Sequence, residues 1–175
     1  MNLRHYQEKA FNEIESSLDE MSIVIAKLAW IRPGFQEMNN YCSANDIQLS
    51  IVTNGLEFYV DALLQKAHLR DIPSYSIKVT GSPKKLEYSY PYATEECWEW
   101  GNCKCKVLFE HRGGDTKIVY AGDGRSDFCV AQQADFVFAR STLLQHCQRL
   151  GIPHMEFKDF YDVLAAFQHG LPSIK

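Results

Sequence analysis

The sequence has no run of about 18 uncharged apolar residues, the length that a membrane-spanning helix requires. It also begins without the apolar core of a secretory signal peptide, since MNLRHYQEKAFNEIE is largely polar. We therefore expect a cytoplasmic protein with no membrane partner. The sequence has no excess of basic residues for a surface that binds nucleic acid or an acidic membrane, because it contains 18 Lys and Arg and 22 Asp and Glu. The resulting formal charge of -4 argues against a nucleic-acid partner.

The chain has 175 residues, of which 46% are hydrophobic and 23% are charged, as in an ordinary globular protein. This length predicts a single domain over residues 1–175. Without a leader, the six cysteines favour thiols over disulfides. Cys97, Cys103 and Cys105 lie near His111 and could bind zinc, but C-x5-C-x-C is not the paired spacing of structural zinc sites. The alternative is a set of ordinary thiols beside a loop.

Helix and strand patterns alternate along most of the chain. Apolar residues recur every three or four positions at Phe11, Ile14, Leu18, Met21, Ile25 and Leu28, which predicts one helix over residues 3–29. Its apolar face packs on the rest of the chain or on a partner. Further helices are predicted at 33–46, 56–69, 104–111, 126–134, 142–151 and 159–168, and strands at 47–52, 117–121 and 135–139. This alternation predicts an α/β fold with a mostly parallel sheet covered on both faces.

Residues 71–101 interrupt the alternation. The segment YSIKVTGSPKKLEYSYPY predicts a β-hairpin around Gly81-Ser82-Pro83, and ATEECWEWGN predicts an irregular loop. We interpret the stretch as an insertion between two α/β parts. Its aromatic residues either shape substrate specificity or pack the loop; they are Tyr88, Tyr90, Tyr92, Trp98 and Trp100.

Two turns at predicted strand ends carry groups suited to phosphate chemistry. Thr53, Asn54 and Gly55 offer a hydroxyl and successive backbone N–H groups before a helix, which suits an anion, although such a turn is also common without a ligand. The second turn is GDGRSD, in which Asp123 and Asp127 could bind Mg²⁺, one directly and one in support. The alternative makes them a turn residue and a helix cap.

A lysine lies between these turns in the sequence. Lys106 at a helix start could be solvated, or it could neutralise phosphate as a point charge. Thr53, Lys106 and GDGRSD in this order resemble the second, third and fourth motifs of the haloacid dehalogenase superfamily, in its phosphoserine-phosphatase-like branch. The likeness extends over roughly residues 30–165.

The resemblance implies a three-layer Rossmann-like core, with residues 1–30 as the remnant of a helical cap. It also implies a Mg²⁺-dependent phosphatase that acts on a small phosphorylated metabolite. Thr53, Asn54, Gly55 and Lys106 would bind the phosphoryl group, with Thr53 and Lys106 assisting catalysis. Asp123 would ligate Mg²⁺ and Asp127 would help to hold it.

One motif of the superfamily is missing. Its members begin with an apolar strand followed by Asp-x-Asp, whose first aspartate is the nucleophile, and no Asp-x-Asp occurs in this sequence. Asp19 does not replace it, because no apolar strand precedes it. Two functions therefore stay open: a phosphomonoesterase, or a truncated or degenerate relative that binds phosphate, Mg²⁺ or a protein partner. A response-regulator-like domain is a third alternative, but it would also need an acidic cluster.

The missing strand also matters for the sheet, because in the superfamily it lies centrally, between the strands that end at Thr53 and Asp123. These two strands would then pair directly, or another strand would fill the gap. The candidates are SIVIAKLAW refolded as a strand, a strand from a second copy, and a separate N-terminal segment. We expect a homo-oligomer or a rearranged sheet, since unpaired backbone groups are costly in a core.

Overall fold

The computed structural model describes residues 2–171, and the chain divides into two compact units. Unit 1 takes the chain up to Ile31 together with Leu49–Cys103, and unit 2 takes Arg32–Gln48 and the chain from Lys104 onward. Both contain helices and parallel strands, so the predicted α/β class is confirmed. That the two units make one domain stays a prediction. No helix within residues 2–171 has the length and apolarity needed to cross a membrane.

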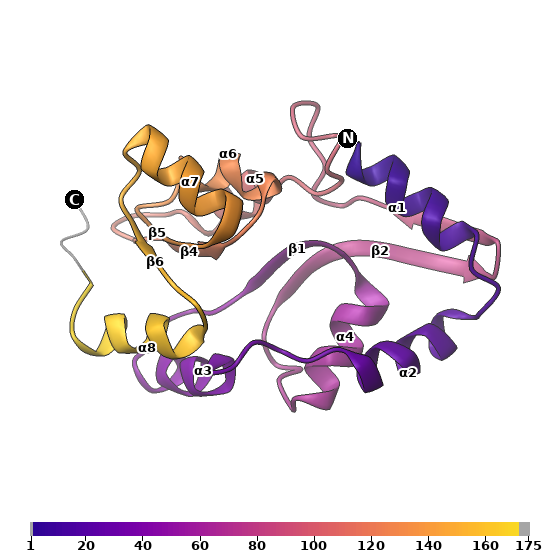
Figure 1. The fold of residues 1–175 in the computed structure, drawn as a ribbon, viewed down its shortest axis with the longest axis horizontal. Helices are drawn as coiled ribbons and strands as arrows, with labels where there is room; N and C mark the ends of the chain where they lie inside the picture. The colour runs from indigo at the N-terminus through magenta and orange to yellow at the C-terminus, as the bar shows by residue number, and fades with distance from the viewer. Residues whose placement is uncertain (1, 172–175) are drawn as a thin grey trace. The chain divides into compact units, whose positions relative to one another are not determined.

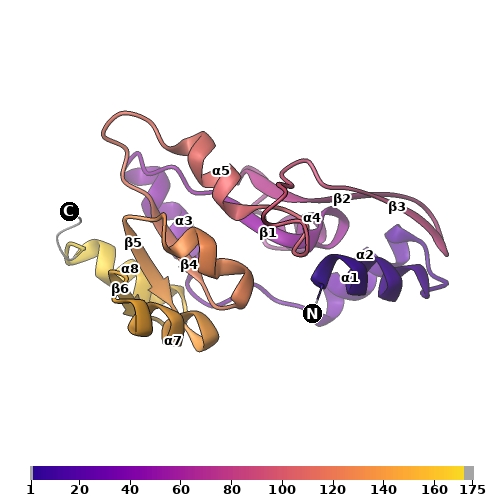
Figure 2. The same ribbon diagram turned by 90° about the horizontal axis from the view of Figure 1, so that it is seen from above.

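The sheet of unit 1 has the strand order β1-β2-β3 and combines both strand directions. Strand β1 (Ile51–Leu56) is parallel to β2 (Ser74–Ser82), which pairs antiparallel with β3 (Lys85–Ser89). The β2–β3 hairpin confirms the sequence prediction and is long (Figure 2). The predicted strand at 47–52 is placed too early, since β1 continues through Thr53, Asn54 and Gly55.

The helices of unit 1 are α1 (Leu3–Asn12), α2 (Leu18–Leu28) and α4 (Glu57–Lys66). The prediction of one helix over residues 3–29 is therefore wrong. Ser17 starts α2 with a capping box, because its Oγ accepts from the Glu20 backbone N–H (3.3 Å) and Glu20 Oε2 accepts from the Ser17 N–H (2.8 Å). Met21 of α2 is buried in the core with Leu56, Ile77, Val79 and Leu86, whereas Leu28 is 72% exposed.

Unit 2 is a three-layer α/β/α sandwich (Figure 1). Its parallel strands follow the order β4 (Val119–Gly122), β5 (Phe136–Ala139) and β6 (His154–Glu156). One face carries α5 (Lys104–His111), α6 (Phe128–Ala131) and α7 (Ser141–Leu150); the other carries α3 (Phe35–Ala44) and α8 (Phe160–Gln168). A short 3-10 helix, η1 (Arg125–Asp127), leads into α6. Strand β6 was not predicted.

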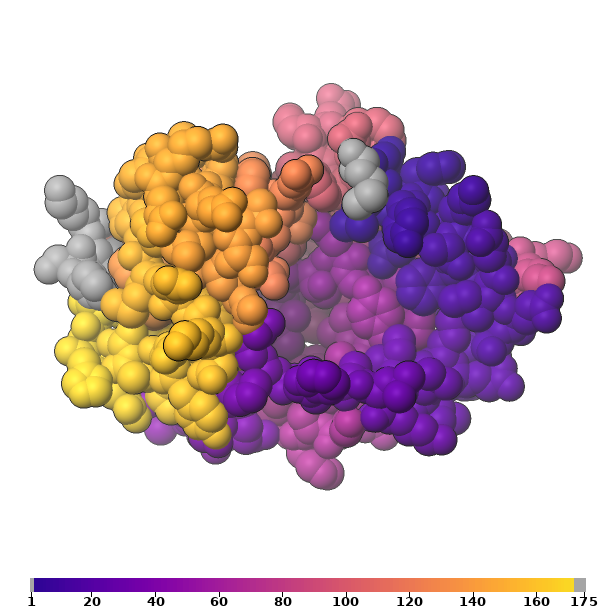
Figure 3. Space-filling view, in the orientation of Figure 1, coloured from indigo at the N-terminus to yellow at the C-terminus, as the bar shows by residue number. Residues whose placement is uncertain are grey.

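Alternation along β5 explains the three layers of unit 2. Val137 and Ala139 pack with Leu143 of α7, whereas the next side chain, Phe138, stacks on Phe167 of α8 with ring centroids 6.2 Å apart. Successive side chains of a strand point to opposite faces, so every position of this buried strand is apolar. In the view of Figure 3, α7 and α8, orange and yellow, form much of the surface of this unit.

One of the alternatives for the central strand is not found. The segment SIVIAKLAW does not form a strand, because most of it lies in α2. Strand β1 belongs to the sheet of unit 1 and β4 to the sheet of unit 2, and a direct pairing of the two stays a prediction. A strand from a second copy and a separate N-terminal segment stay predictions.

Candidate functional site

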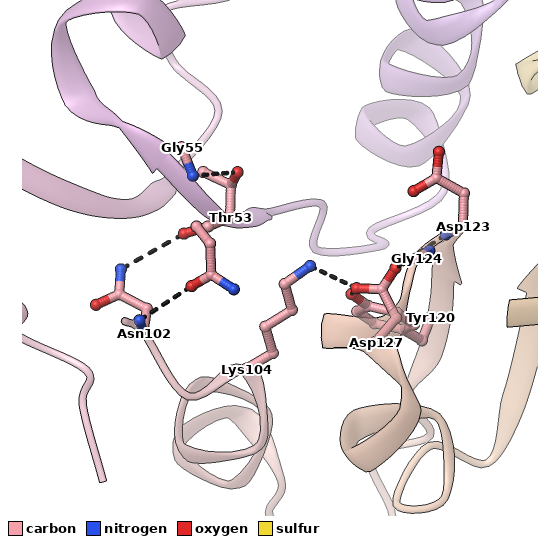
Figure 4. Close-up of polar contacts among 9 residues, drawn as sticks. Thr53, Gly55, Asn102, Lys104, Tyr120, Asp123, Gly124 and Asp127 are labelled. Atoms are coloured by element: carbon pink, nitrogen blue, oxygen red, sulfur yellow. Dashed lines mark hydrogen bonds and ion pairs between the residues drawn. The ribbon is translucent and has the colours of Figure 1, made fainter. Parts of the chain in front are cut away.

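Asp127 is buried beside the carboxyl end of β4, with 2% of its surface exposed. Its Oδ1 forms an ion pair with Nζ of Lys104 and accepts from the hydroxyl of Tyr120 at 2.7 Å. Its Oδ2 accepts from the backbone N–H groups of Asp123 (2.9 Å) and Gly124 (2.8 Å). Figure 4 shows these contacts, which lie within unit 2. Asp127 therefore fixes the turn after β4 and orients Lys104.

The charges of this cluster follow from its contacts. Burial disfavours the charged Asp127 carboxylate, but the Lys104 ammonium and the hydrogen bonds outweigh this effect and lower the pKa of Asp127. The pKa of Tyr120 is raised well above its ordinary value by burial, and further by the facing Asp127 carboxylate. At neutral pH Asp127 is thus ionised and Tyr120 is protonated, as the donor and acceptor geometry requires.

Asp123 follows β4 directly and is exposed. Its backbone is held on both sides, since its N–H donates to Asp127 and its carbonyl accepts from the Leu143 N–H at 3.2 Å. Its carboxylate points away from Asp127 (Figure 4). A Cβ at Gly122 would lie 2.7 Å from Asp127 Oδ2, so the close approach of the turn depends on glycine. The result is an exposed carboxylate on a fixed backbone.

The described residues offer limited ligands to the predicted Mg²⁺. Asp123 supplies carboxylate oxygens, whereas each oxygen of Asp127 already holds two hydrogen bonds. Within residues 2–171, no group of three or more His, Cys, Asp or Glu side chains could hold a metal ion. Mg²⁺ keeps several waters and often binds proteins through one or two carboxylates, so the arrangement fits it with Asp123 as the direct ligand. Asp127 would act by holding the turn.

Lys104, which sequence reasoning missed, is the lysine that pairs with Asp127. Lys106 is half-buried on the same helix, α5, two positions further on. Residues two apart on a helix lie about 200° apart around its axis, so the two lysines cannot face the same group. The predicted role of Lys106 stays a prediction, whereas the geometry favours Lys104. The only signal in the sequence was that KCK offers two lysines, of which Lys104 is the first.

In unit 1, Thr53, Asn54 and Gly55 lie within β1 at an irregularity of its pairing with β2. Val52 pairs with Tyr75 and Leu56 pairs with Ile77, so β1 advances four residues over a stretch in which β2 advances two. Thr53 Oγ1 accepts from the Gly55 N–H at 2.9 Å, which closes the local turn (Figure 4). The Thr53 hydroxyl thereby keeps its own hydrogen for another acceptor.

Asn54 carries a buried donor next to this turn. Its Oδ1 accepts from the Asn102 backbone N–H at 3.0 Å, and its carbonyl accepts from Gln7 Nε2 at 3.2 Å. A backbone N–H can only donate, so the atom facing it is the amide oxygen and the orientation of the side chain is defined. Nδ2 of Asn54 is buried and has no acceptor among the described residues. Such a donor is costly unless a ligand or water accepts from it.

The tyrosines of the predicted insertion pack within unit 1. Tyr90 donates to Glu8 Oε1 at 2.6 Å, and the Arg4 guanidinium lies 3.9 Å from the centre of its ring. Burial, and then the Glu8 carboxylate, raise the pKa of Tyr90. Tyr92 makes an edge-to-face contact with Tyr75 at 5.3 Å. These contacts favour the packing interpretation, while Trp98 is 51% exposed.

The structure gives no support to zinc at the cysteine cluster. In the described chain no metal-binding group forms from Cys97, Cys103, Cys105 and His111. Cys103 and Cys105 are 4% and 6% exposed, as buried thiols often are.

Comparisons with known proteins give no match to a family model. The chain is 32% identical to the 2-hydroxy-3-keto-5-methylthiopentenyl-1-phosphate phosphatase of Brevibacillus brevis, over 91% of this chain and 73% of that protein. It is 36% identical to the phosphatase of the same name from Geobacillus kaustophilus, over 91% of this chain and 74% of that protein. The corresponding protein of Geobacillus thermodenitrificans is 33% identical, with the same coverage of 91% and 74%.

The parallel α/β fold and the aspartate turn define a protein of the haloacid dehalogenase class, and the resemblance seen in the sequence is confirmed. The chain belongs to the family of 2-hydroxy-3-keto-5-methylthiopentenyl-1-phosphate phosphatases.

Proposed function

We propose that this chain binds the phosphoryl group of a small phosphorylated metabolite together with Mg²⁺, and that it does not hydrolyse the ester by itself. The observation that carries the proposal is the Asp127 cluster, which holds the Lys104 ammonium in place and presents the exposed Asp123 carboxylate. The relatives are named as phosphatases of a phosphate ester, which supports a ligand of this class.

Each residue has a defined task in this proposal. Bound Mg²⁺ would offset negative charge on the phosphoryl oxygens. Asp123 would hold it, and Lys104 would supply a fixed positive charge. Within unit 1 alone, the Thr53 hydroxyl and the buried Nδ2 of Asn54 are separate donors that suit an anion, and their part in phosphoryl binding rests on the family resemblance.

The proposed lack of turnover applies to these 175 residues by themselves and rests on the nucleophile motif. No Asp-x-Asp occurs in the chain, and removing a covalent nucleophile costs many orders of magnitude in rate. A phosphomonoesterase is the second candidate function, because relatives that share 32% to 36% of their residues with the chain are named as phosphatases.

Calorimetry of the full chain with inorganic phosphate, with and without MgCl₂, tests the proposal. We expect Mg²⁺-dependent binding that is lost in Asp123→Asn. Lys104→Gln should weaken binding at least about tenfold, since a charge-assisted hydrogen bond contributes about 1.5–3 kcal/mol. Lys106→Gln on the same helix distinguishes the two lysines: nearly normal binding would assign the role to Lys104, and a comparable loss would assign it to Lys106 as well.

Hydrolysis of p-nitrophenyl phosphate completes the test. Turnover that Asp123→Asn removes would overturn the non-catalytic part of the proposal and establish a phosphomonoesterase. No phosphate binding in the presence or absence of Mg²⁺ would overturn the proposal as a whole. Circular dichroism of each variant separates a binding defect from unfolding.

A further inference from the structure

Two cysteines of unit 2 meet beside the Asp127 cluster. Cys105 lies on α5 and Cys129 on α6, and their Sγ atoms are 2.6 Å apart. The helices pack against each other, and both side chains are thiols rather than halves of a disulfide. The two thiols are thus in direct contact, and only a small movement is needed to bring them to the geometry of a disulfide.

The two thiols differ in their access to solvent. Cys129 is exposed, whereas Cys105 is buried, with 6% of its surface exposed. A small oxidant can therefore reach Cys129 first, and the thiol next to it is positioned to react with the product. Oxidation-sensitive cysteines are often exposed and lie next to a second cysteine in this way. Cys42 and Cys147 are only 2% and 0% exposed, so an oxidant has no comparable access to them.

We propose that Cys105 and Cys129 form a redox-modification site at which a peroxide produces an intrachain disulfide. Hydrogen peroxide oxidises the Cys129 thiol to a sulfenic acid and is reduced to one water. The Cys105 sulfur then attacks the sulfenic sulfur, the S–S bond forms, and a second water leaves. Overall, two thiols and one peroxide give one disulfide and two waters, and a dithiol reductant reverses the change.

The position of the pair connects oxidation to the Asp127 cluster. Cys105 follows Lys104 directly, and Cys129 lies two residues after Asp127, so the crosslink would join the segments that carry this ion pair. The disulfide would therefore hold α5 and α6 together at the base of the aspartate turn.

Peroxide treatment of the full chain, followed by non-reducing peptide mapping, tests this proposal. We expect a crosslinked peptide pair containing Cys105 and Cys129 that dithiothreitol releases, and slower amide exchange in α5 and α6 of the oxidised chain. Cys129→Ser, at an exposed position, should abolish the crosslink without unfolding the protein. Cys42→Ser is the control and should crosslink normally.

Two results would overturn the proposal. One is oxidation of Cys129 to a sulfinic acid, or no oxidation, with Cys105 still reduced. The other is a disulfide that links a different pair and persists in Cys129→Ser. Neither result depends on phosphate or Mg²⁺ binding, so the test is independent of the proposed function.

Discussion

Lys104 and Asp127 form an ion pair across 23 positions of the sequence, and both partners are largely buried, with side-chain exposures of 12% and 3%. Replacing one partner of such a buried ion pair by a neutral residue lowers the stability of the fold strongly, because the other charge stays buried without a counter-ion. The predictions for unit 2 follow from this relationship.

Asp127→Asn should destabilise the protein by about 3–5 kcal/mol, because Lys104 loses its counter-ion in a buried site. The amide also brings an N–H group to a place where two backbone N–H groups already donate. Urea unfolding followed by circular dichroism measures the change. Asp115→Asn, at an exposed position, is the control and should stay within about 0.5 kcal/mol of the parent. Equal stability of the two variants would contradict a buried ion pair.

Acid should lower the free energy of unfolding, because it protonates the Asp127 carboxylate. Because the pKa of Asp127 is lowered in the folded state, its contribution to stability is full above the unfolded-state pKa of about 3.9. The contribution is lost as pH falls through the lower pKa of the folded state. The difference in free energy of unfolding between the parent and Asp127→Asn should therefore be constant near neutral pH and shrink below about pH 4. Parallel curves down to pH 2 would refute this assignment.

Gly122→Ala should destabilise the protein by about 1–3 kcal/mol, since overpacking at a tight contact forces neighbouring atoms to move. The added Cβ would lie 2.7 Å from Asp127 Oδ2 and 2.8 Å from Cε1 of Tyr120. Thermal unfolding measures the effect. Gly113→Ala is the matched control, because nothing lies within 4 Å of its Cβ position. It should be neutral or slightly stabilising, and a similar loss in both variants would point to backbone entropy instead of the contact.

Ser17→Ala should cost about 1 kcal/mol, because it removes the oxygen that accepts from the Glu20 N–H at the start of α2. The measurement is the free energy of unfolding together with amide exchange in α2. Ser16→Ala, one residue earlier, controls for the loss of a hydroxyl. Equal effects of the two substitutions would mean that the capping box does not stabilise this helix start.

The sequence predicted the parts of the fold that local patterns determine. The β2–β3 hairpin and α5 follow from turn residues and apolar spacing, and both were found. The break between α1 and α2 was missed because the apolar repeat continues across it, although Ser17 and Glu20 form a recognisable capping signal. Strand β6 has only three residues, too few for a period to be visible.

The candidate site was predictable only in part. Asp123 and Asp127 were identified from their spacing on the turn, but which carboxylate is buried depends on contacts with Lys104 and Tyr120. The choice between Lys104 and Lys106 depends on the rotation of α5, which the sequence does not reveal. The orientation of Asn54 likewise depends on Asn102, 48 residues away.

The connectivity of unit 2 has a consequence for synthesis on the ribosome. Helix α3 comes from an early part of the chain, yet its packing partner α8 comes from the last part described: the rings of Phe35 and Phe160 are 4.8 Å apart, and the Phe160 N–H donates to the Pro33 carbonyl at 2.8 Å. The apolar face of α3 therefore stays without this cover until nearly the whole described chain has emerged. Domains fold as units during translation, so unit 2 would be completed late, and a nascent chain halted before α8 would expose Phe35 to chaperones and proteases.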